Sequence, residues 1–374
     1  MAGLLVAEDV TAGHPDRLAD LVVESLVEAV QFADPFAAVG LEVALHRELL
    51  LVTGYVAADR QSRNPLTAGD AGPAWLQRRV DEVVRSAGYQ DQWSLPLTTH
   101  SDVVVVHRTD SITEGQGFSC DQDVVVGHAT PDAALGHLPL EVVAARAARD
   151  ALASVQAARP DLFGPDGKVL VVLRPDGPGA VVEHLNIATV HRPGVGYGDL
   201  YGEVAPAVVD ALRALPGVDA PDSVDASWCT VNGAGEFLLP GPRGDGGLSG
   251  KKLVADLYGP RVPIGGGALC GKDAFKADRC GPLRARQVAV RLARATGTEA
   301  SVWAGWFPGQ ARPSFLWARL GDGRELDESQ VDQLVGLPDL SIRGTVAELE
   351  LNGQPWTQHL RRGYVGADHP WDRG

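Results

Sequence analysis

Apolar residues near the start of the chain recur at the spacing of a helix face. One side of a helix that begins near Asp16 carries Leu18, Leu21, Val22, Leu26, Val27 and Val30. Two apolar runs follow, at residues 37–45 and 49–56, and predict two strands. The polar residues 46–48 between them predict the turn that makes these strands a hairpin.

The rest of the chain alternates irregularly between helical and extended patterns. Helices are predicted at residues 73–87, 139–158, 204–215 and 282–295. Strands are predicted at residues 101–107, 124–126, 169–173 and 180–189, and again within 301–320. We expect residues 110–121 to form a loop and residues 164–168 a turn. No low-complexity linker separates the parts, which favours closely packed α+β domains.

Composition narrows the class of protein. The 374 residues, of which 45% are hydrophobic, can bury a large core in more than one domain. A formal net charge of −15 disfavours a general nucleic-acid binder. No apolar run reaches membrane length and the N-terminus lacks a basic leader, so we expect a cytoplasmic protein without a membrane partner. The four cysteines lack metal-ligand spacing, which suggests reduced thiols.

Residues 241–278 form a glycine-rich segment in which most of the candidate phosphate-binding residues are concentrated. It holds four of the five lysines of the chain, and the fifth is Lys168. Glycines let backbone N–H groups approach an anion and lysines neutralise it, so this segment predicts a polyphosphate site rather than a flexible surface loop. Gly271-Lys272 nearly completes a P-loop, but Asp273 stands where the magnesium-binding hydroxyl belongs, and we exclude a P-loop.

A second candidate is the turn that precedes the first helix. His14 and Asp16 fall at a helix N-terminus, where anions and their metals are favoured. From these residues alone the alternative stays open that Asp16 only caps the helix and His14 is exposed.

Several short sequence motifs follow one another along the chain. They are Gly13-His14-Pro15-Asp16, Asp121-Gln122 ahead of Gly127-His128, Pro165-Asp166-Gly167-Lys168, Gly241-Pro242 to Lys252, Gly265-Gly266-Gly267-Ala268, Gly271-Lys272-Asp273 to Asp278, and Gly366 to Trp371. The same motifs occur in the same order in the methionine adenosyltransferase (S-adenosylmethionine synthetase) family. The chain resembles this family over nearly its whole length.

The resemblance implies a fold and an activity. It implies three similar α+β domains with pseudo-threefold symmetry, which we place at residues 1–108, 115–238 and 239–374. It also implies a homodimer or dimer of dimers with sites between subunits. The family joins ATP to a thioether: sulfur attacks C5′, and the released tripolyphosphate is hydrolysed to pyrophosphate and phosphate. A thioether has no proton to remove, which agrees with a chain rich in cation sites and without an evident catalytic triad.

The resemblance also assigns residues. It implies catalytic roles for His14, Lys168, Lys251, Lys252 and Lys272. It implies ATP contacts for these five and for Asp166, Phe237, Asp245 and Ala268. It implies acceptor contacts for Tyr55, Asp121, Asp245 and Lys276. It implies Mg²⁺ at Asp16 and Asp278, and K⁺ at Glu42.

Some positions depart from the family pattern. Tyr55 replaces a glutamate that meets the ammonium of methionine, and Asp123 replaces a glycine. Glu236 replaces an arginine, whereas Arg17 and Lys251 exchange one cation for another. The segment ahead of Asp121 is shorter than the family's gating loop. We therefore expect ATP recognition to persist and recognition of the acceptor's amino end to be altered.

Three functions remain open from sequence. The first is an adenosyltransferase that acts on methionine or an analogue. The second is a hydrolase of tripolyphosphate or ATP with the same fold, and the third is a non-catalytic nucleotide-binding relative. Retention of all the lysines and both metal carboxylates disfavours the third.

Overall fold

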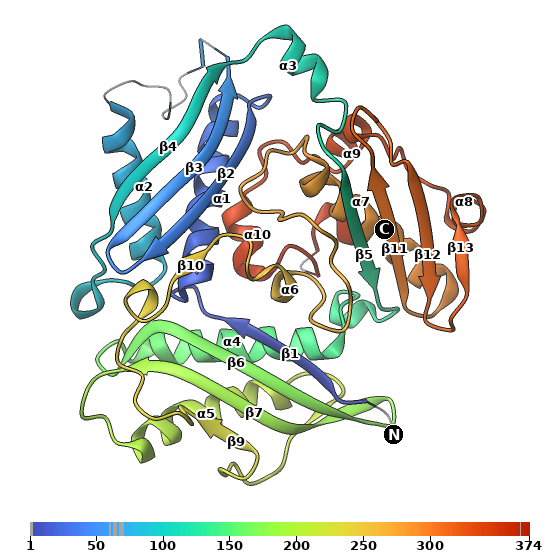
Figure 1. The fold of residues 1–374 in the computed structure, drawn as a ribbon. Helices are drawn as coiled ribbons and strands as arrows, with labels where there is room; N and C mark the ends of the chain where they lie inside the picture. The colour runs from blue at the N-terminus through green and yellow to red at the C-terminus, as the bar shows by residue number, and fades with distance from the viewer. Residues whose placement is uncertain (1–2, 60, 63–65, 67–70, 367) are drawn as a thin grey trace.

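The computed structural model describes residues 3–374 except 60, 63–65, 67–70 and 367. Met1, Ala2 and Ala367, which entered the sequence interpretation, lie outside the described residues. Three β-sheets surround a central region of loops and short helices in an α+β fold (Figure 1). Within the described part of the chain, no helix is long and apolar enough to cross a membrane.

The first sheet has the order β10-β2-β3-β4. Its strands are β10 (Gly247–Leu248), β2 (Ala38–His46), β3 (Leu49–Ala58) and β4 (Thr98–His107). The predicted hairpin is confirmed, and Arg47 takes a φ of 54° in its turn. Helices α1 (Pro15–Ala33) and α2 (Ala71–Ser86) pack together, and α1 lies against β2 with its predicted apolar face buried.

The second sheet has the order β1-β6-β7-β8, with β9 also paired to β7. Its strands are β1 (Leu5–Val10), β6 (Phe163–Asp176), β7 (Gly179–His191), β8 (Val218–Asp219) and β9 (Cys229–Val231). Helix α4 (Leu140–Ala158) packs on β1 and β6, and α5 (Tyr197–Arg213) packs on α4. The turn predicted at residues 164–168 is wrong: these residues belong to β6, where a register shift between Phe163 and Gly167 accommodates them.

The third sheet has the order β13-β12-β11-β5. Its strands are β13 (Glu325–Asp327), β12 (Phe315–Leu320), β11 (Ala300–Trp306) and β5 (Asp123–Ala129). Helix α7 (Ala277–Thr296) covers β5 and β11, and contacts α8 (Glu328–Val335) and α9 (Ile342–Glu348).

Two further predictions need correction near this sheet. Helix α7 begins at Ala277 instead of Pro282, so Asp278 lies in its first turn. Residues 110–121 do not form only a loop, because they open with the short helix α3 (Asp110–Gly115). The Thr109 hydroxyl oxygen accepts the Ile112 N–H at 3.4 Å and caps this helix.

The remaining elements are short. They are α6 (Leu253–Asp256), α10 (Trp356–Arg362) and single 3₁₀ turns at Asp91–Trp93, Ala133–Leu135, Gly241–Arg243 and Pro370–Asp372. The chain end packs into the core, where Trp371 is buried and donates its indole N–H to the Tyr364 carbonyl at 2.7 Å. All four cysteines are free.

Each sheet takes one strand from a distant part of the chain. In Figure 1 the blue β1 lies on the green β6, the yellow β10 on the blue β2, and the green β5 beside the orange β11. These exchanges bring the turn after β1, the glycine-rich segment and the start of α7 toward the centre. The continuous domain ranges stay a prediction.

Candidate functional site

His14 caps the N-terminus of α1. Its Nδ1 accepts the Asp16 backbone N–H at 3.3 Å, and its side chain is buried, so the alternative of an exposed His14 is wrong. Burial, joined by the nearby cations Lys252 and Lys168, lowers the pKa of His14 to about 3. The ring is therefore neutral at pH 7. Because Nδ1 is an acceptor, the proton is on Nε2, which can act as a donor.

Asp16 forms ion pairs with two lysines at the N-terminus of the same helix. Its Oδ1 accepts the Leu248 N–H at 3.1 Å and lies 3.4 Å from Lys251 Nζ, and its Oδ2 lies 3.0 Å from Lys252 Nζ. Burial would raise the pKa of Asp16, but the Leu248 hydrogen bond and Lys252 outweigh it, so the pKa is lowered. We call His14, Asp16, Lys251 and Lys252 the lysine cluster.

The first turns of α1 hold the backbone that carries these lysines. Asp20 Oδ1 accepts the Gly250 N–H at 2.7 Å, just before Lys251. Arg17 Nη2 lies 2.5 Å from Asp256 Oδ1, at the end of α6 just after Lys252. Both sides of the lysine pair are thereby attached to one helix.

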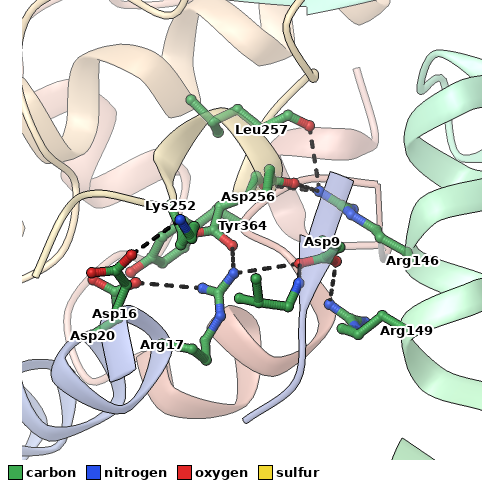
Figure 2. Close-up of polar contacts among 12 residues, drawn as sticks. Asp9, Asp16, Arg17, Asp20, Arg146, Arg149, Lys252, Asp256, Leu257 and Tyr364 are labelled. Carbon is green, nitrogen blue, oxygen red and sulfur yellow. Dashed lines mark hydrogen bonds and ion pairs between the residues drawn. The ribbon is translucent and has the colours of Figure 1, made fainter. Parts of the chain in front are cut away.

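Arg17 lies at the centre of a buried ion network (Figure 2). Besides Asp256, its guanidinium lies 3.7 Å from Asp9 and 3.6 Å from Asp20. Although burial alone would lower it, the pKa of Arg17 is raised by these carboxylates. Arg149 Nη1 donates to Asp9 Oδ2 at 2.7 Å, and Arg146 Nη2 donates to the Asp256 carbonyl at 2.8 Å. Removing one member would leave an unpaired charge in the interior.

Pro165 and Asp166 of β6 join the turn after β1 to the start of the glycine-rich segment. Its buried Oδ2 accepts the Gly241 N–H at 2.7 Å, and burial raises its pKa to about 7. The Thr11 hydroxyl donates to the Pro165 carbonyl at 2.7 Å. A Cβ at Gly13 would lie 2.6 Å from the Pro165 carbonyl carbon, so this close approach requires glycine.

The other predicted ATP residues lie along these same segments. Lys168 pairs with Val10 between β6 and β1, and its charge acts on both His14 and Asp166. Asp245 donates its N–H to the Gly241 carbonyl at 3.1 Å. Phe237, four residues before Gly241, is half-buried. Its carbonyl accepts the His191 N–H at 3.0 Å, and its N–H donates to His191 Nε2 at 3.3 Å.

A second group of predicted residues lines a cavity of about 710 Å³, which we call the Tyr55 cavity. Its walls come from β2, β3, β4 and α3, from residues 116–123 and from the start of α7. Tyr55 is 36% exposed and accepts a hydrogen bond from Lys276 Nζ, which lies 5.0 Å from the centre of its ring. Burial would lower the pKa of Lys276, but Asp273 and Tyr55 raise it.

Acidic side chains also line the Tyr55 cavity. Asp121, Asp123, Lys272 and Asp278 all line it. Burial, then the Asp278 carboxylate, raises the pKa of Asp123 to about 7, and Lys272 offsets this only in part. Asp278 Oδ1 would lie 1.7 Å from a Cβ at Gly267, so a glycine is needed there to admit this carboxylate.

Glu42 and Ala268 lie on segments close to the residues already described. Glu42 is exposed on β2, between Gly40, which bridges to Lys272, and Ala44, which pairs with Leu248. Ala268 lies beside Gly250, the residue before Lys251, because a Cβ at Gly250 would be 3.0 Å from the Ala268 Cβ.

Within one chain the two groups stay apart. None of the lysine cluster is among the described residues that line the Tyr55 cavity. Asp16 and Asp278, which sequence analysis assigned to Mg²⁺, therefore belong to different groups. Over the described ranges, no three acidic, histidine or cysteine side chains gather as a metal site.

Sequence reasoning missed several residues that support the site. Asp20 and Asp256 anchor the lysine-bearing backbone, and Tyr89 donates its hydroxyl proton to the Gly13 carbonyl at 2.5 Å. Asp20 follows Asp16 by one helical turn, a spacing that could have indicated it. The other two are distant in sequence from what they contact and carry no local signal.

Comparison with known families and proteins finds matches along nearly the whole chain. Residues 3–111 match the S-adenosylmethionine synthetase N-terminal domain and residues 239–373 match its C-terminal domain. The S-adenosylmethionine synthase of Corynebacterium diphtheriae is 29% identical, over 99% of this chain and 94% of that protein. That of Maricaulis maris is 28% identical with the same coverage. An unusual S-adenosylmethionine synthetase from Campylobacter jejuni superposes with a TM-score of 0.84 at 22% identity, over 99% of this chain and 97% of that one.

Proposed function

Because the chain belongs to the S-adenosylmethionine synthetase family as a divergent member, we propose that it is an ATP-dependent adenosyltransferase. An acceptor thioether sulfur attacks C5′ of ATP, the C5′–O bond breaks, and the electron pair leaves with tripolyphosphate. The tripolyphosphate is then hydrolysed to pyrophosphate and phosphate. The observation that carries the proposal is the lysine cluster, in which two lysines and a neutral histidine meet at one helix N-terminus.

His14 supplies a donor without a full charge. Its Nε2–H can donate to the oxygen that leaves C5′, while Nδ1 is fixed by the Asp16 N–H. A ring held in one tautomer keeps this donor aimed as negative charge develops on that oxygen.

The lysines hold the triphosphate. Lys251 and Lys252 both pair with Asp16, whose carboxylate keeps them close together. A triphosphate carries more negative charge than Asp16, so both ammonium groups turn toward it when it binds. Lys168 and Lys272 add charge, and Phe237, Asp166, Asp245 and Ala268 complete the nucleotide site.

The donor set fits Mg²⁺ and K⁺. Magnesium is commonly held by one or two carboxylates together with substrate phosphates and water, and Asp16 and Asp278 can supply those carboxylates. When bound, the metal neutralises the polyphosphate. Glu42 is an oxygen ligand suited to K⁺.

Two copies of the chain complete each site. The lysine cluster and the Tyr55 cavity are separate in one chain, and a homodimer, alone or as a dimer of dimers, brings the cluster of one copy to the cavity of the other. The acceptor is methionine or an analogue whose amino end is recognised differently, with its carboxylate at Lys276 and with Asp121, Asp245 and Tyr55 around it.

Mass spectrometry of the products tests the proposal. The protein is incubated with ATP, Mg²⁺ and a panel of thioethers, thiols and amines, and we expect an adenosylated thioether together with phosphate and pyrophosphate. Phosphate release without any adenosylated product would refute adenosyl transfer and leave only a hydrolase.

A further inference from the structure

Arg279 and Glu24 form a buried ion pair between α7 and α1. Arg279 Nη1 donates to Glu24 Oε1 at 2.8 Å, Nη2 donates to Oε2 at 2.7 Å, and both side chains are fully buried. Tyr364 also donates its hydroxyl proton to Glu24 Oε1, and the Arg279 guanidinium lies 4.1 Å from the centre of the Trp356 ring. Two parallel bonds to one carboxylate fix the plane of a guanidinium as well as its position.

The same guanidinium holds the backbone of Lys272. Arg279 Nε and Nη2 donate to the Lys272 carbonyl at 3.3 and 3.1 Å. Strand β2 holds the residues on either side, Gly271 and Asp273, through backbone hydrogen bonds of 2.8 and 3.1 Å. The carbonyl between them is thus bound by Arg279, and the peptide from which the Lys272 side chain extends is fixed.

Arg279 acts from behind the Tyr55 cavity. Lys272 and Asp278 line this cavity, whereas Arg279, the residue after Asp278, is not among the described residues that do. A fully buried side chain cannot contact a ligand in the cavity, so any effect of Arg279 on a ligand must pass through its neighbours. Since a lysine side chain is flexible, the backbone from which it extends limits where its ammonium can reach.

Stability alone is a weak reason for this ion pair. A buried pair often contributes no more to folding than apolar side chains of similar volume, although loss of one partner is costly. Here the pair ends on the carbonyl of a residue that sequence analysis assigned to the phosphates. It also joins that residue to α1, whose N-terminus carries the lysine cluster.

We propose that Arg279, held by Glu24, is a positioning residue that fixes the reach of Lys272 into the Tyr55 cavity and thereby its contact with bound polyphosphate. This inference rests on the proposed function, in which Lys272 binds the phosphates of ATP and of the tripolyphosphate product. Arg279 itself contacts neither molecule.

The test is calorimetric binding of inorganic tripolyphosphate with Mg²⁺ to the full-length protein and to Arg279→Lys. Lysine keeps the charge beside Glu24, but an ammonium cannot reproduce the planar fork that joins Glu24 to the Lys272 carbonyl. We expect the Kd for tripolyphosphate to rise about tenfold, as misplacement of one phosphate-binding cation implies.

Arg286→Lys is the matched control. Arg286 also lies on α7, is fully buried and pairs with a carboxylate, that of Asp372, at 2.9 Å. Its other hydrogen bonds go to the carbonyls of Gly136, His128 and His137, outside the Lys272 segment. Both variants should lower the melting temperature, whereas only Arg279→Lys should raise the Kd.

A double-mutant cycle separates positioning from a general structural role. Lys272→Ala should raise the Kd about 100-fold, because a cation opposite a polyanion is lost. Adding Arg279→Lys to it should raise the Kd no further, because the side chain that Arg279 positions is gone. A second tenfold rise in the Lys272→Ala background would show that Arg279 acts on the whole fold and would overturn the proposal.

Glu24→Asp repeats the test without removing a charge. It shortens the carboxylate by one methylene and should raise the Kd about threefold when Lys272 is present and not at all when it is absent. An unchanged Kd in both variants, or in the only one that folds, would overturn this inference while tripolyphosphate still binds. Absence of binding to the unmodified protein would instead overturn the phosphate site of the proposed function, and this inference with it.

Discussion

The lysine cluster and the Tyr55 cavity differ in how firmly the surrounding chain holds them. In the lysine cluster, Asp16 is buried and contacts two lysines and a backbone N–H, and Arg17 beside it joins a buried network. In the Tyr55 cavity, Tyr55 is 36% exposed and Asp123 has an oxygen without a partner. A change in the first region disturbs many contacts, whereas the second can change one side chain at a time.

The departures from the family pattern follow this division. Arg17 and Lys251 preserve the positive charge at their positions. Tyr55 and Asp123 instead remove one carboxylate from the cavity wall and add another. We therefore propose that the chain combines a retained site for ATP with a modified site for the acceptor.

The largest effect is expected when a phosphate-binding cation is lost from either region. Lys252→Ala and Lys272→Ala should each reduce turnover by several decades, because removing a cation opposite a bound polyanion costs a few kcal/mol or more. Steady-state assays of phosphate release check this, with thermal unfolding as the control for folding. Near-normal release from either variant would contradict the assignment of that lysine.

A smaller effect is expected from the network behind the lysine cluster. Asp256→Asn removes the carboxylate that lies 2.5 Å from Arg17 and should raise the KM for ATP about tenfold, because the backbone after Lys252 loses its anchor. The KM for the acceptor should stay the same.

Asp372→Asn is the matched control for this prediction. Asp372 is also buried and lies 2.9 Å from the buried Arg286, but it does not contact the lysine-bearing segment. Both variants should lower the melting temperature. An equal rise in the KM for ATP in both would mean that Asp256 acts only through stability.

The smallest effect is expected at Tyr55. Tyr55→Glu places a carboxylate beside Lys276 and should shift preference toward L-methionine over its des-amino analogue by about threefold, well below the full value of a charge-assisted hydrogen bond. The gain is limited because the new carboxylate also pairs with Lys276, which the acceptor carboxylate needs. Tyr55→Phe, which keeps the ring, is the control. A lower preference for L-methionine in Tyr55→Glu would contradict this account of the cavity.

The elements with regular spacing could be predicted from sequence, and those that depend on distant contacts could not. Helix α1 and the β2–β3 hairpin were predicted because their apolar positions are periodic. Residues 164–168 were mistaken for a turn because glycine and proline usually mark one, whereas here pairing with distant β1 and β7 extends β6 through them.

The site residues divide in the same way. Short local blocks predicted that the lysines and Asp16 belong to a site, and the structure places Asp16 beside Lys251 and Lys252. It also places Tyr55 beside Lys276 in one cavity. Pairing of Arg17 with Asp256 joins residues far apart in sequence, and no local pattern reports it. The separation of the lysine cluster from the Tyr55 cavity likewise follows from the fold alone.

Complementation between two inactive variants tests most directly whether these regions are halves of one site shared by two copies. Lys252→Ala disables the lysine cluster and Lys272→Ala disables the Tyr55 cavity. If sites form between copies, a mixed dimer has one site with both defects and one with neither. Random pairing during co-expression should then restore about a quarter of the unmodified activity, because about half of the dimers are mixed and each has one intact site of two. Activity no higher than that of either variant alone, in preparations that contain mixed dimers, would contradict the shared site.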